Sequence, residues 1–103
     1  MSKYYNQRTY SQVCNMIFAS KLKANRAEEL TLLEKCGVIS DLSFQVPYKL
    51  CSKPRVSIVI DFAYIEDGKM IFEDTKGFLT REARVKLAWL KEKYGIDVKL
   101  IRK

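Results

Sequence analysis

The sequence predicts a single α/β domain with a mixed sheet, its elements in the order (ββ)-α-β-β-β-α-β and its helices flanking the sheet. Apolar residues recur at helical spacing in two segments, and between these segments they alternate or run together as they do in strands. A last strand-like segment follows the second helical one. With 103 residues, of which 48% are hydrophobic, the chain can bury one core but not two. We therefore expect residues 1–103 to form one domain.

The N-terminal segment, residues 1–18, is expected to form an arm followed by a hairpin. The first seven residues look like a mobile arm. Arg8 to Phe18 is rich in Thr, Tyr, Val, Ile and Phe, which predicts a short β-hairpin.

The first helix is predicted to begin after Ser20, whose side chain can cap the first turn. Gly37 is well placed to end it, because glycine readily adopts the left-handed conformation found after helix C-termini. The apolar stripe that should face the core consists of Leu22, Leu30 and Leu33, with Ala27 at its edge.

Three strands are predicted between the helices. From Leu42 to Leu50 apolar and polar residues alternate, which is typical of a half-buried strand, and Pro47 indicates that this strand lies at an edge or bends. Val56 to Tyr64 is mostly apolar or β-branched, which predicts a central strand. Glu66-Asp67-Gly68-Lys69 predicts a tight turn, because Asp-Gly adopts positive φ angles easily, and Met70 to Lys76 then returns as the partner strand.

The second helix is predicted to run from about Thr80 to Tyr94 and to stop at Gly95, with a final strand at Asp97 to Ile101. Trp89 and Phe62 are also assigned to the core. The stripe of the second helix that should be buried consists of Ala83, Leu87, Leu90 and Tyr94.

The composition excludes several classes of enzyme. The chain has no histidine, so a Ser/His/Asp or Cys/His hydrolase has no base. Its cysteines, Cys14, Cys36 and Cys51, form no CxxC pair that would anchor zinc, and we expect reduced thiols in a cytoplasmic protein. No apolar run reaches the ~18 residues of a membrane span, and the N-terminus lacks the apolar segment of a signal peptide. Any catalysis must therefore use carboxylates, lysines and a bound metal.

The net charge of +7 is unevenly distributed. Residues 1–55 carry nine basic and four acidic side chains, and residues 77–103 carry eight and three. Residues 56–76, in contrast, carry two basic and five acidic side chains. Basic flanks around an acidic centre suit a protein that holds a polyanion and coordinates a divalent cation at one point along it, although a soluble basic domain with an acidic hairpin tip has the same composition.

Two aspartates are predicted to face each other in the hairpin. Pairing outward from the Asp-Gly turn places Asp61 opposite Asp74, with Lys76 on the same face and with Glu73 and Thr75 pointing the other way. Opposed carboxylates destabilise a sheet unless positive charge lies between them.

A divalent metal such as Mg²⁺ would resolve this conflict between Asp61 and Asp74. Lys76 would then hold or deprotonate an attacking water, or neutralise charge that develops on a phosphate. The alternative is a surface Asp–Lys–Asp cluster that Lys76 neutralises by itself.

The pattern of Asp61 followed by Asp74-Thr75-Lys76 resembles the PD-(D/E)xK phosphodiesterase motif. Longer stretches carry the same likeness: Phe18–Lys21, Glu29–Ile39, Gln45, Ile60–Tyr64 and Glu73–Gly77. Together, over residues 3–102, they resemble a family of small phage-encoded nucleases of the Holliday-junction-resolvase type.

This resemblance implies a restriction-endonuclease-like sheet. It also implies that Asp61 and Asp74 ligate Mg²⁺ or Mn²⁺, that Lys76 serves the hydrolytic water, and that Gln45 approaches the site from the neighbouring strand. A branched-DNA substrate such as a four-way junction, a homodimer and a location in the host cytoplasm follow from the resemblance alone.

One position departs from the family pattern. The first helix of such nucleases usually offers a glutamate to the metal in a Ser-Lys-x-Glu-Ala context, whereas this chain has Lys23 at that place. A lysine in the first helical turn also opposes the helix dipole, at a cost of ~0.3–1 kcal/mol. Lys23 therefore marks an adaptation, a lost activity or a change introduced to disarm the enzyme.

Basic residues on both helices and in the N-terminal segment are candidates for contacts with DNA phosphates. The aromatic residues of the arm would either stack on nucleic acid or pack on a partner subunit. The candidate DNA-binding residues are Lys3, Arg8, Lys21, Lys23, Arg26, Arg81, Arg84 and Lys86.

The favoured function is a metal-dependent endonuclease that hydrolyses phosphodiester bonds in branched DNA, with an activity that Lys23 impairs. The competing function is a catalytically inactive DNA-binding protein on the nuclease scaffold. A third function, a structural basic domain with no nucleic-acid role, is disfavoured by the opposed aspartates.

Overall fold

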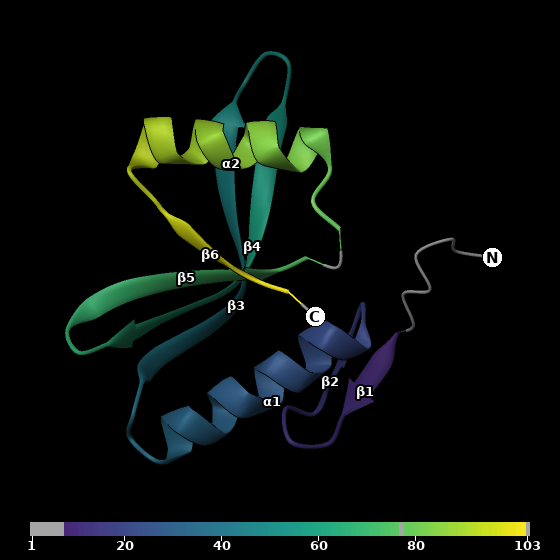
Figure 1. The fold of residues 1–103 in the computed structure, drawn as a ribbon, viewed down its shortest axis with the longest axis vertical. Helices are drawn as coiled ribbons and strands as arrows, with labels where there is room; N and C mark the ends of the chain where they lie inside the picture. The colour runs from purple at the N-terminus through teal and green to yellow at the C-terminus, as the bar shows by residue number, and fades with distance from the viewer. Residues whose placement is uncertain (1–7, 77, 103) are drawn as a thin grey trace.

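The computed structural model describes residues 8–76 and 78–102, and in this part of the chain it has an α/β fold with six strands and two helices (Figure 1). The predicted order of elements is confirmed. The elements are β1 (Thr9–Ser11), β2 (Met16–Phe18), α1 (Lys21–Lys35), β3 (Ser40–Cys51), β4 (Val56–Glu66), β5 (Lys69–Thr75), α2 (Arg81–Tyr94) and β6 (Val98–Ile101). Neither helix in these ranges is long and apolar enough to cross a membrane. The predicted N-terminal arm, with Lys3, lies outside the described residues.

The main sheet has the strand order β3-β4-β5-β6. β4 is antiparallel to both β3 and β5, while β6 runs parallel to β5, so the sheet is mixed as predicted. β3 lies at the edge and β4 lies inside, which confirms the positions expected from the proline and from the apolar run. β1 and β2 form a separate two-stranded hairpin that packs beside α1 (Figure 1).

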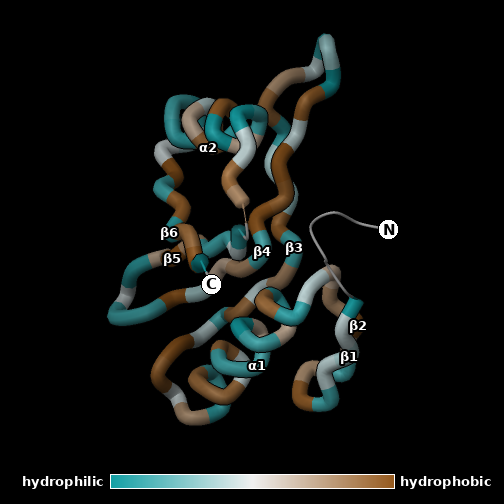
Figure 2. The backbone as a smooth tube through the Cα atoms, turned by 45° about the vertical axis from the view of Figure 1, so that its right-hand side comes forward, coloured by the Kyte–Doolittle hydropathy of each residue, from teal (hydrophilic) through white to brown (hydrophobic). Residues whose placement is uncertain are grey.

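Two hydrophobic clusters stabilise the fold, one under each helix. The first cluster joins α1 to Phe18, Phe62 and Tyr64, and the second joins α2 to Leu50 and Ile60. β4 contributes to both clusters, and Figure 2 shows its hydrophobic run passing between the two helices. The residue between Ile60 and Phe62 therefore lies where the two clusters meet, and that residue is Asp61.

β3 carries an unusual backbone conformation at this junction. Gln45 has a φ of 55°, a value that costs a side-chain-bearing residue energy. Its neighbours Phe44 and Val46 pair with Phe62 and Ile60, so Gln45 lies beside Asp61 on the neighbouring strand. Phe44 belongs to the cluster under α1, whereas residues later in β3 belong to the cluster under α2.

α1 begins and packs as the sequence predicts, with small differences. The Ser20 hydroxyl accepts a hydrogen bond from the backbone of Lys23, which confirms the N-cap. Ala27 and Leu30 are buried as expected, and Ala24 is buried with them.

α2 differs more from its predicted packing. Leu90 is buried, but Tyr94 and Trp89 are 43% and 37% exposed, so placing them in the core was wrong. Tyr94 lies along the edge of the sheet, where its hydroxyl donates to the carbonyl of Lys49. Trp89 projects about 100° around the helix from Leu90, because each residue advances the helix by that angle, and this turns it away from the cluster.

Candidate functional site

The predicted opposition of Asp61 and Asp74 is present. β4 pairs with β5 from Phe62 opposite Glu73 to Glu66 opposite Lys69, next to the turn. This confirms the register expected from the Asp-Gly turn. One residue further out, the backbone N–H of Asp61 donates to Asp74 Oδ1 at 3.1 Å. Asp61 is 3% exposed and Asp74 1%, so two carboxylates are buried side by side.

Asp61 has a partner at each carboxylate oxygen. Its Oδ2 accepts hydrogen bonds from the Thr75 backbone N–H at 2.9 Å and from the Thr75 hydroxyl at 2.8 Å. Its Oδ1 accepts from Lys23 Nζ at 3.1 Å. Burial acts to raise the pKa of Asp61, but the Thr75 hydrogen bonds and the Lys23 charge outweigh it and lower that pKa. The prediction that Thr75 points away from the pair was wrong, since its hydroxyl reaches Asp61.

Asp74 is less well satisfied. Its buried Oδ2 has no hydrogen-bond donor among the described residues. Lys76 Nζ lies 2.7 Å from this oxygen as an ion pair, without the angles of a hydrogen bond. Burial and the neighbouring charge of Asp61 raise the pKa of Asp74, and Lys76 only partly opposes them. Among the described residues, Asp74 Oδ2 is therefore held by the Lys76 charge alone, without a hydrogen bond.

Lys23 reaches the pair from α1. It lies in the first turn of the helix, three residues after the Ser20 cap. Its ammonium forms an ion pair with Asp61. Position 23, where the nuclease resemblance expects a glutamate, thus faces Asp61 in this chain. With Lys23 on Asp61 and Lys76 on Asp74, each carboxylate has one ammonium beside it.

A second charged group lies next to the pair, toward α1. Arg26 Nε and Nη2 donate to the two carboxylate oxygens of Glu73 at 2.8 and 2.7 Å, and the Tyr64 hydroxyl also donates to Glu73. Burial acts to raise the pKa of Glu73, but the hydrogen bonds from Arg26 and Tyr64 outweigh it and lower that pKa. Arg26 was a candidate for DNA contact, yet its guanidinium is occupied inside the protein.

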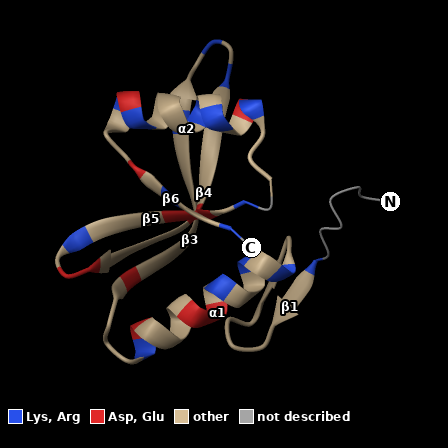
Figure 3. Ribbon diagram, viewed as in Figure 1, with Lys and Arg blue, Asp and Glu red and all other residues tan. Residues whose placement is uncertain are grey.

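The remaining predicted site residues that the structure describes are exposed or half-exposed. Gln45 is exposed on β3 beside Asp61. Lys86 forms an ion pair with Glu82 at 3.5 Å. The exposed basic candidates are Arg8, Lys21, Arg81 and Arg84. Figure 3 shows Lys and Arg on both helices, with acidic residues where the strands of the main sheet cross.

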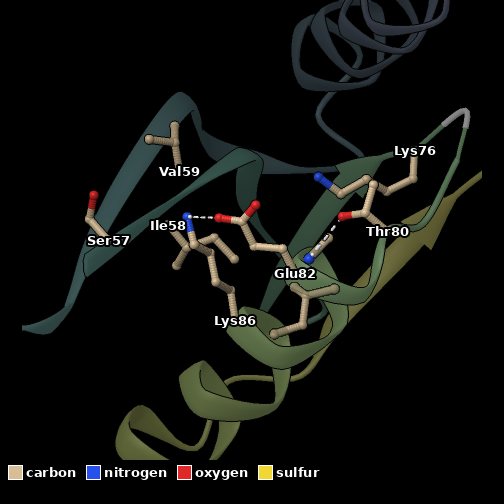
Figure 4. A pocket seen from close by; sticks show the side chains of 9 residues that line it. Ser57, Ile58, Val59, Lys76, Thr80, Glu82 and Lys86 are labelled. Carbon is tan, nitrogen blue, oxygen red and sulfur yellow. Dashed lines mark hydrogen bonds and ion pairs between the residues drawn. The ribbon is translucent and has the colours of Figure 1, made fainter. Parts of the chain in front are cut away.

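A cleft of about 350 Å³ adjoins Lys76. One wall is the start of β4, at Ser57 to Val59, and the other is the first turns of α2. Figure 4 shows Lys76, Thr80, Glu82 and Lys86 around this space. Sequence reasoning missed Thr80 and Glu82 as site neighbours, and only the N-cap pattern that opens the second helix pointed to them.

A family model described as "Protein of unknown function (DUF1064)" matches residues 1–102. The chain belongs to the DUF1064 family. No curated protein and no solved structure matches it. The match covers every part of the site described above, from Lys23 to the cleft beside Lys76.

The site of this DUF1064 protein offers two carboxylates to a cation. Within residues 8–76 and 78–102, no three Asp, Glu or Cys side chains come together as a metal-binding group. A divalent ion nevertheless fits the chemistry of Asp74 Oδ2, a buried carboxylate oxygen that makes no hydrogen bond among the described residues and that an ion would share with the Lys76 ammonium. Asp61 Oδ1 becomes the second ligand only if Lys23 withdraws from it.

Proposed function

We propose that this protein is a metal-dependent DNA endonuclease of the PD-(D/E)xK type whose activity is limited by Lys23. The observation that carries the proposal is the buried, opposed pair Asp61 and Asp74, with Lys76 2.7 Å from one of its oxygens. Burying two adjacent carboxylates costs stability, so a site that retains them indicates a function for which the pair is needed.

Each residue of the site would have its own role in phosphodiester hydrolysis. Asp61 and Asp74 would hold Mg²⁺ or Mn²⁺, which supplies Lewis-acid stabilisation of the charge that develops on a phosphodiester. Lys76 would orient a water or neutralise charge on the phosphate, because its ammonium already lies at the edge of the pair and lines the adjoining cleft. Thr75 would keep Asp61 ionised and oriented through its two hydrogen bonds. Gln45 would approach from β3.

Lys23 opposes this chemistry. Its ammonium lies 3.1 Å from the Asp61 oxygen that a cation would need. A metal ion would therefore have to displace the Lys23 ammonium from Asp61. The displaced ammonium would still lie nearby and repel the ion, and both effects reduce metal occupancy.

The same contact favours a second candidate function, an inactive DNA-binding protein on a nuclease scaffold. With Lys23 and Lys76 each paired to one aspartate, the site is neutralised without a metal. The exposed basic residues, Arg8, Lys21, Arg81 and Arg84 among them, would then bind phosphates with no cleavage. The branched-DNA substrate, a homodimer and a cytoplasmic location belong to both proposals and rest on the resemblance to resolvases.

The test of the proposed function is cleavage of a labelled four-way junction with Mg²⁺ or Mn²⁺. The unmodified chain is expected to cut weakly, and Lys23→Glu is expected to raise the rate at least ~10-fold, because it adds an oxygen ligand and removes the repulsion. Lys35→Glu is the matched control, since it makes the same charge change at an exposed position of the same helix, away from the aspartate pair. Adding Lys76→Ala to the Lys23→Glu variant should abolish the gain while junction binding persists.

Two results would contradict this reading. Strong cutting by the unmodified chain with no gain from Lys23→Glu would mean that position 23 does not serve the metal. No cutting by either form, with intact junction binding, would favour the DNA-binding scaffold.

A further inference from the structure

A groove continues from the cleft beside Lys76 along one side of α2. A second hollow of about 420 Å³ lies between Val56, at the start of β4, and the helix residues Arg81, Val85 and Trp89. Glu82 and Lys86 border both hollows, so the two adjoin. We call this surface the α2 groove; its residues are Lys76, Arg81, Glu82, Val85, Lys86 and Trp89.

We infer that the α2 groove binds a single strand of nucleic acid, with Trp89 as the platform on which an unpaired base stacks. Trp89 is the only tryptophan of the chain, and it is 37% exposed although it is one of the largest apolar side chains. Val85, one turn earlier on the same side of α2, is 56% exposed. Neither residue belongs to the hydrophobic cluster under α2. An aromatic ring beside a basic groove is the arrangement that binds unpaired bases, because every base has a face that can stack.

The charges of the groove select an anionic occupant. Arg81, Lys86 and Lys76 are distributed along it, against one acid, Glu82. Glu82 is itself neutralised by Lys86 at 3.5 Å, as the dashed line in Figure 4 shows. Lys76 is likewise paired with Asp74, so Arg81 leaves the groove net positive, within a chain of net charge +7. A second copy of this chain would bring like charges together on this surface, whereas a phosphate backbone is complementary to them.

A paired strand does not fit the role of Trp89, because bases inside a duplex are already stacked on one another. The occupant must therefore present an unpaired base at Trp89, while its phosphates follow Arg81 and Lys86 toward Lys76. The placement at Lys76 rests on the proposed function. A strand that runs from Trp89 to Lys76 would make the substrate a DNA with an unpaired segment next to the scissile phosphate. The binding itself does not depend on cleavage, and it is tested without metal.

The experiment uses the fluorescence of Trp89, which reports on this groove alone because the chain has no other tryptophan. Titrating the full chain in EDTA with a 12-nucleotide oligo(dT) should quench this fluorescence saturably. A blunt duplex of the same length and inorganic polyphosphate should quench it far less.

Two variants separate stacking from apolar docking. Trp89→Phe should keep the affinity for labelled oligo(dT), measured by anisotropy, within a few-fold. Trp89→Leu retains apolar bulk without an aromatic face, and it should weaken the affinity by about 5- to 100-fold. Arg81→Ala should weaken it as well and make the salt dependence shallower.

Three outcomes would overturn the inference. Equal quenching by polyphosphate would mean that only charge is recognised. An unchanged affinity in Trp89→Leu would remove the stacking role. A monomer–dimer equilibrium in sedimentation that Trp89→Asp abolishes would assign the groove to a second copy. None of these results depends on whether Lys23→Glu gains cleavage activity, so failure of the groove and failure of the nuclease proposal are distinguishable.

Discussion

At the scale of single residues, the site shows how neighbouring carboxylates with similar burial acquire opposite pKa shifts. Asp61 receives two hydrogen bonds from Thr75 and the charge of Lys23, and its pKa falls. Burial and then the neighbouring charge of Asp61 raise the pKa of Asp74, and Lys76 only partly opposes them. Hydrogen bonds to the charged form therefore decide which member of a buried pair ionises more easily.

Asp74→Asn is predicted to stabilise the fold and to abolish metal binding. Because the pKa of Asp74 is raised above its ordinary value of 3.8, the ionised carboxyl costs the native state free energy. This cost is absent below the ordinary pKa, where the group is protonated in both states, and appears as the pH rises through the folded pKa. Urea unfolding should therefore show a larger gain for Asp74→Asn at pH 7 than near pH 3.5.

Calorimetry with Mn²⁺ measures the second part of this prediction. The unmodified chain should show a site that disappears in Asp74→Asn. Asp67→Asn, which alters an exposed carboxylate in the hairpin turn, should leave that site intact. If Asp61→Asn and Asp74→Asn both leave Mn²⁺ binding and stability unchanged, the pair does not hold a metal.

At the scale of elements, α1 is attached to the sheet by a charged contact as well as by its apolar face. The Arg26 guanidinium makes a bidentate ion pair with Glu73 of β5, and Glu73 also accepts from Tyr64 of β4. This contact lies one helical turn from Lys23, so it also sets the distance between α1 and Asp61. The helix that brings Lys23 to the aspartate pair is thus positioned by Glu73, the residue next to Asp74.

Arg26→Ala is predicted to destabilise the fold by about 3 kcal/mol, because it leaves the fully buried Glu73 charge without its partner. Lys21→Ala, an exposed change on the same helix, should alter the unfolding free energy by no more than about 0.5 kcal/mol. Adding Glu73→Gln to Arg26→Ala should recover part of the loss, since it removes the uncompensated charge. A loss in Arg26→Ala no larger than that in Lys21→Ala would mean that the ion pair contributes little.

At the scale of the whole molecule, the acidic site lies between two basic helices on a flat body of 42 × 40 × 21 Å (Figure 3). The segments before and after the hairpin each carry a net charge of +5, while the hairpin segment 56–76 carries −3. Basic residues thus outnumber acidic ones on both sides of the aspartate pair, and this distribution would attract a polyanion to the flanks while the pair itself needs a cation or its two lysines beside it.

DNA binding is predicted to depend steeply on salt. If phosphate contacts dominate, the affinity should fall on the order of tenfold or more between roughly 50 and 200 mM salt, because bound lysines and arginines release counterions from the DNA. Filter binding across a salt series measures this. A flat response would remove the polyanion as a partner.

The sequence by itself determined the elements and the register of the central hairpin. These features are local. The period of apolar residues sets which segments are helices and strands, and the Asp-Gly turn sets which residues of β4 and β5 face each other. Asp61 opposite Asp74 could be predicted for this reason, with no knowledge of the rest of the fold.

Only the tertiary structure decided what surrounds that pair. The contact of Lys23 with Asp61 joins residues 38 positions apart, and that of Arg26 with Glu73 joins residues 47 apart. Trp89, expected in the core, is exposed for a similar reason. A periodic pattern predicts that a helix has an apolar face, but the packing of that helix against distant strands decides its rotation and which side chains it covers. Contacts across such distances depend on the direction of each helix over the sheet, which no local run of residues encodes.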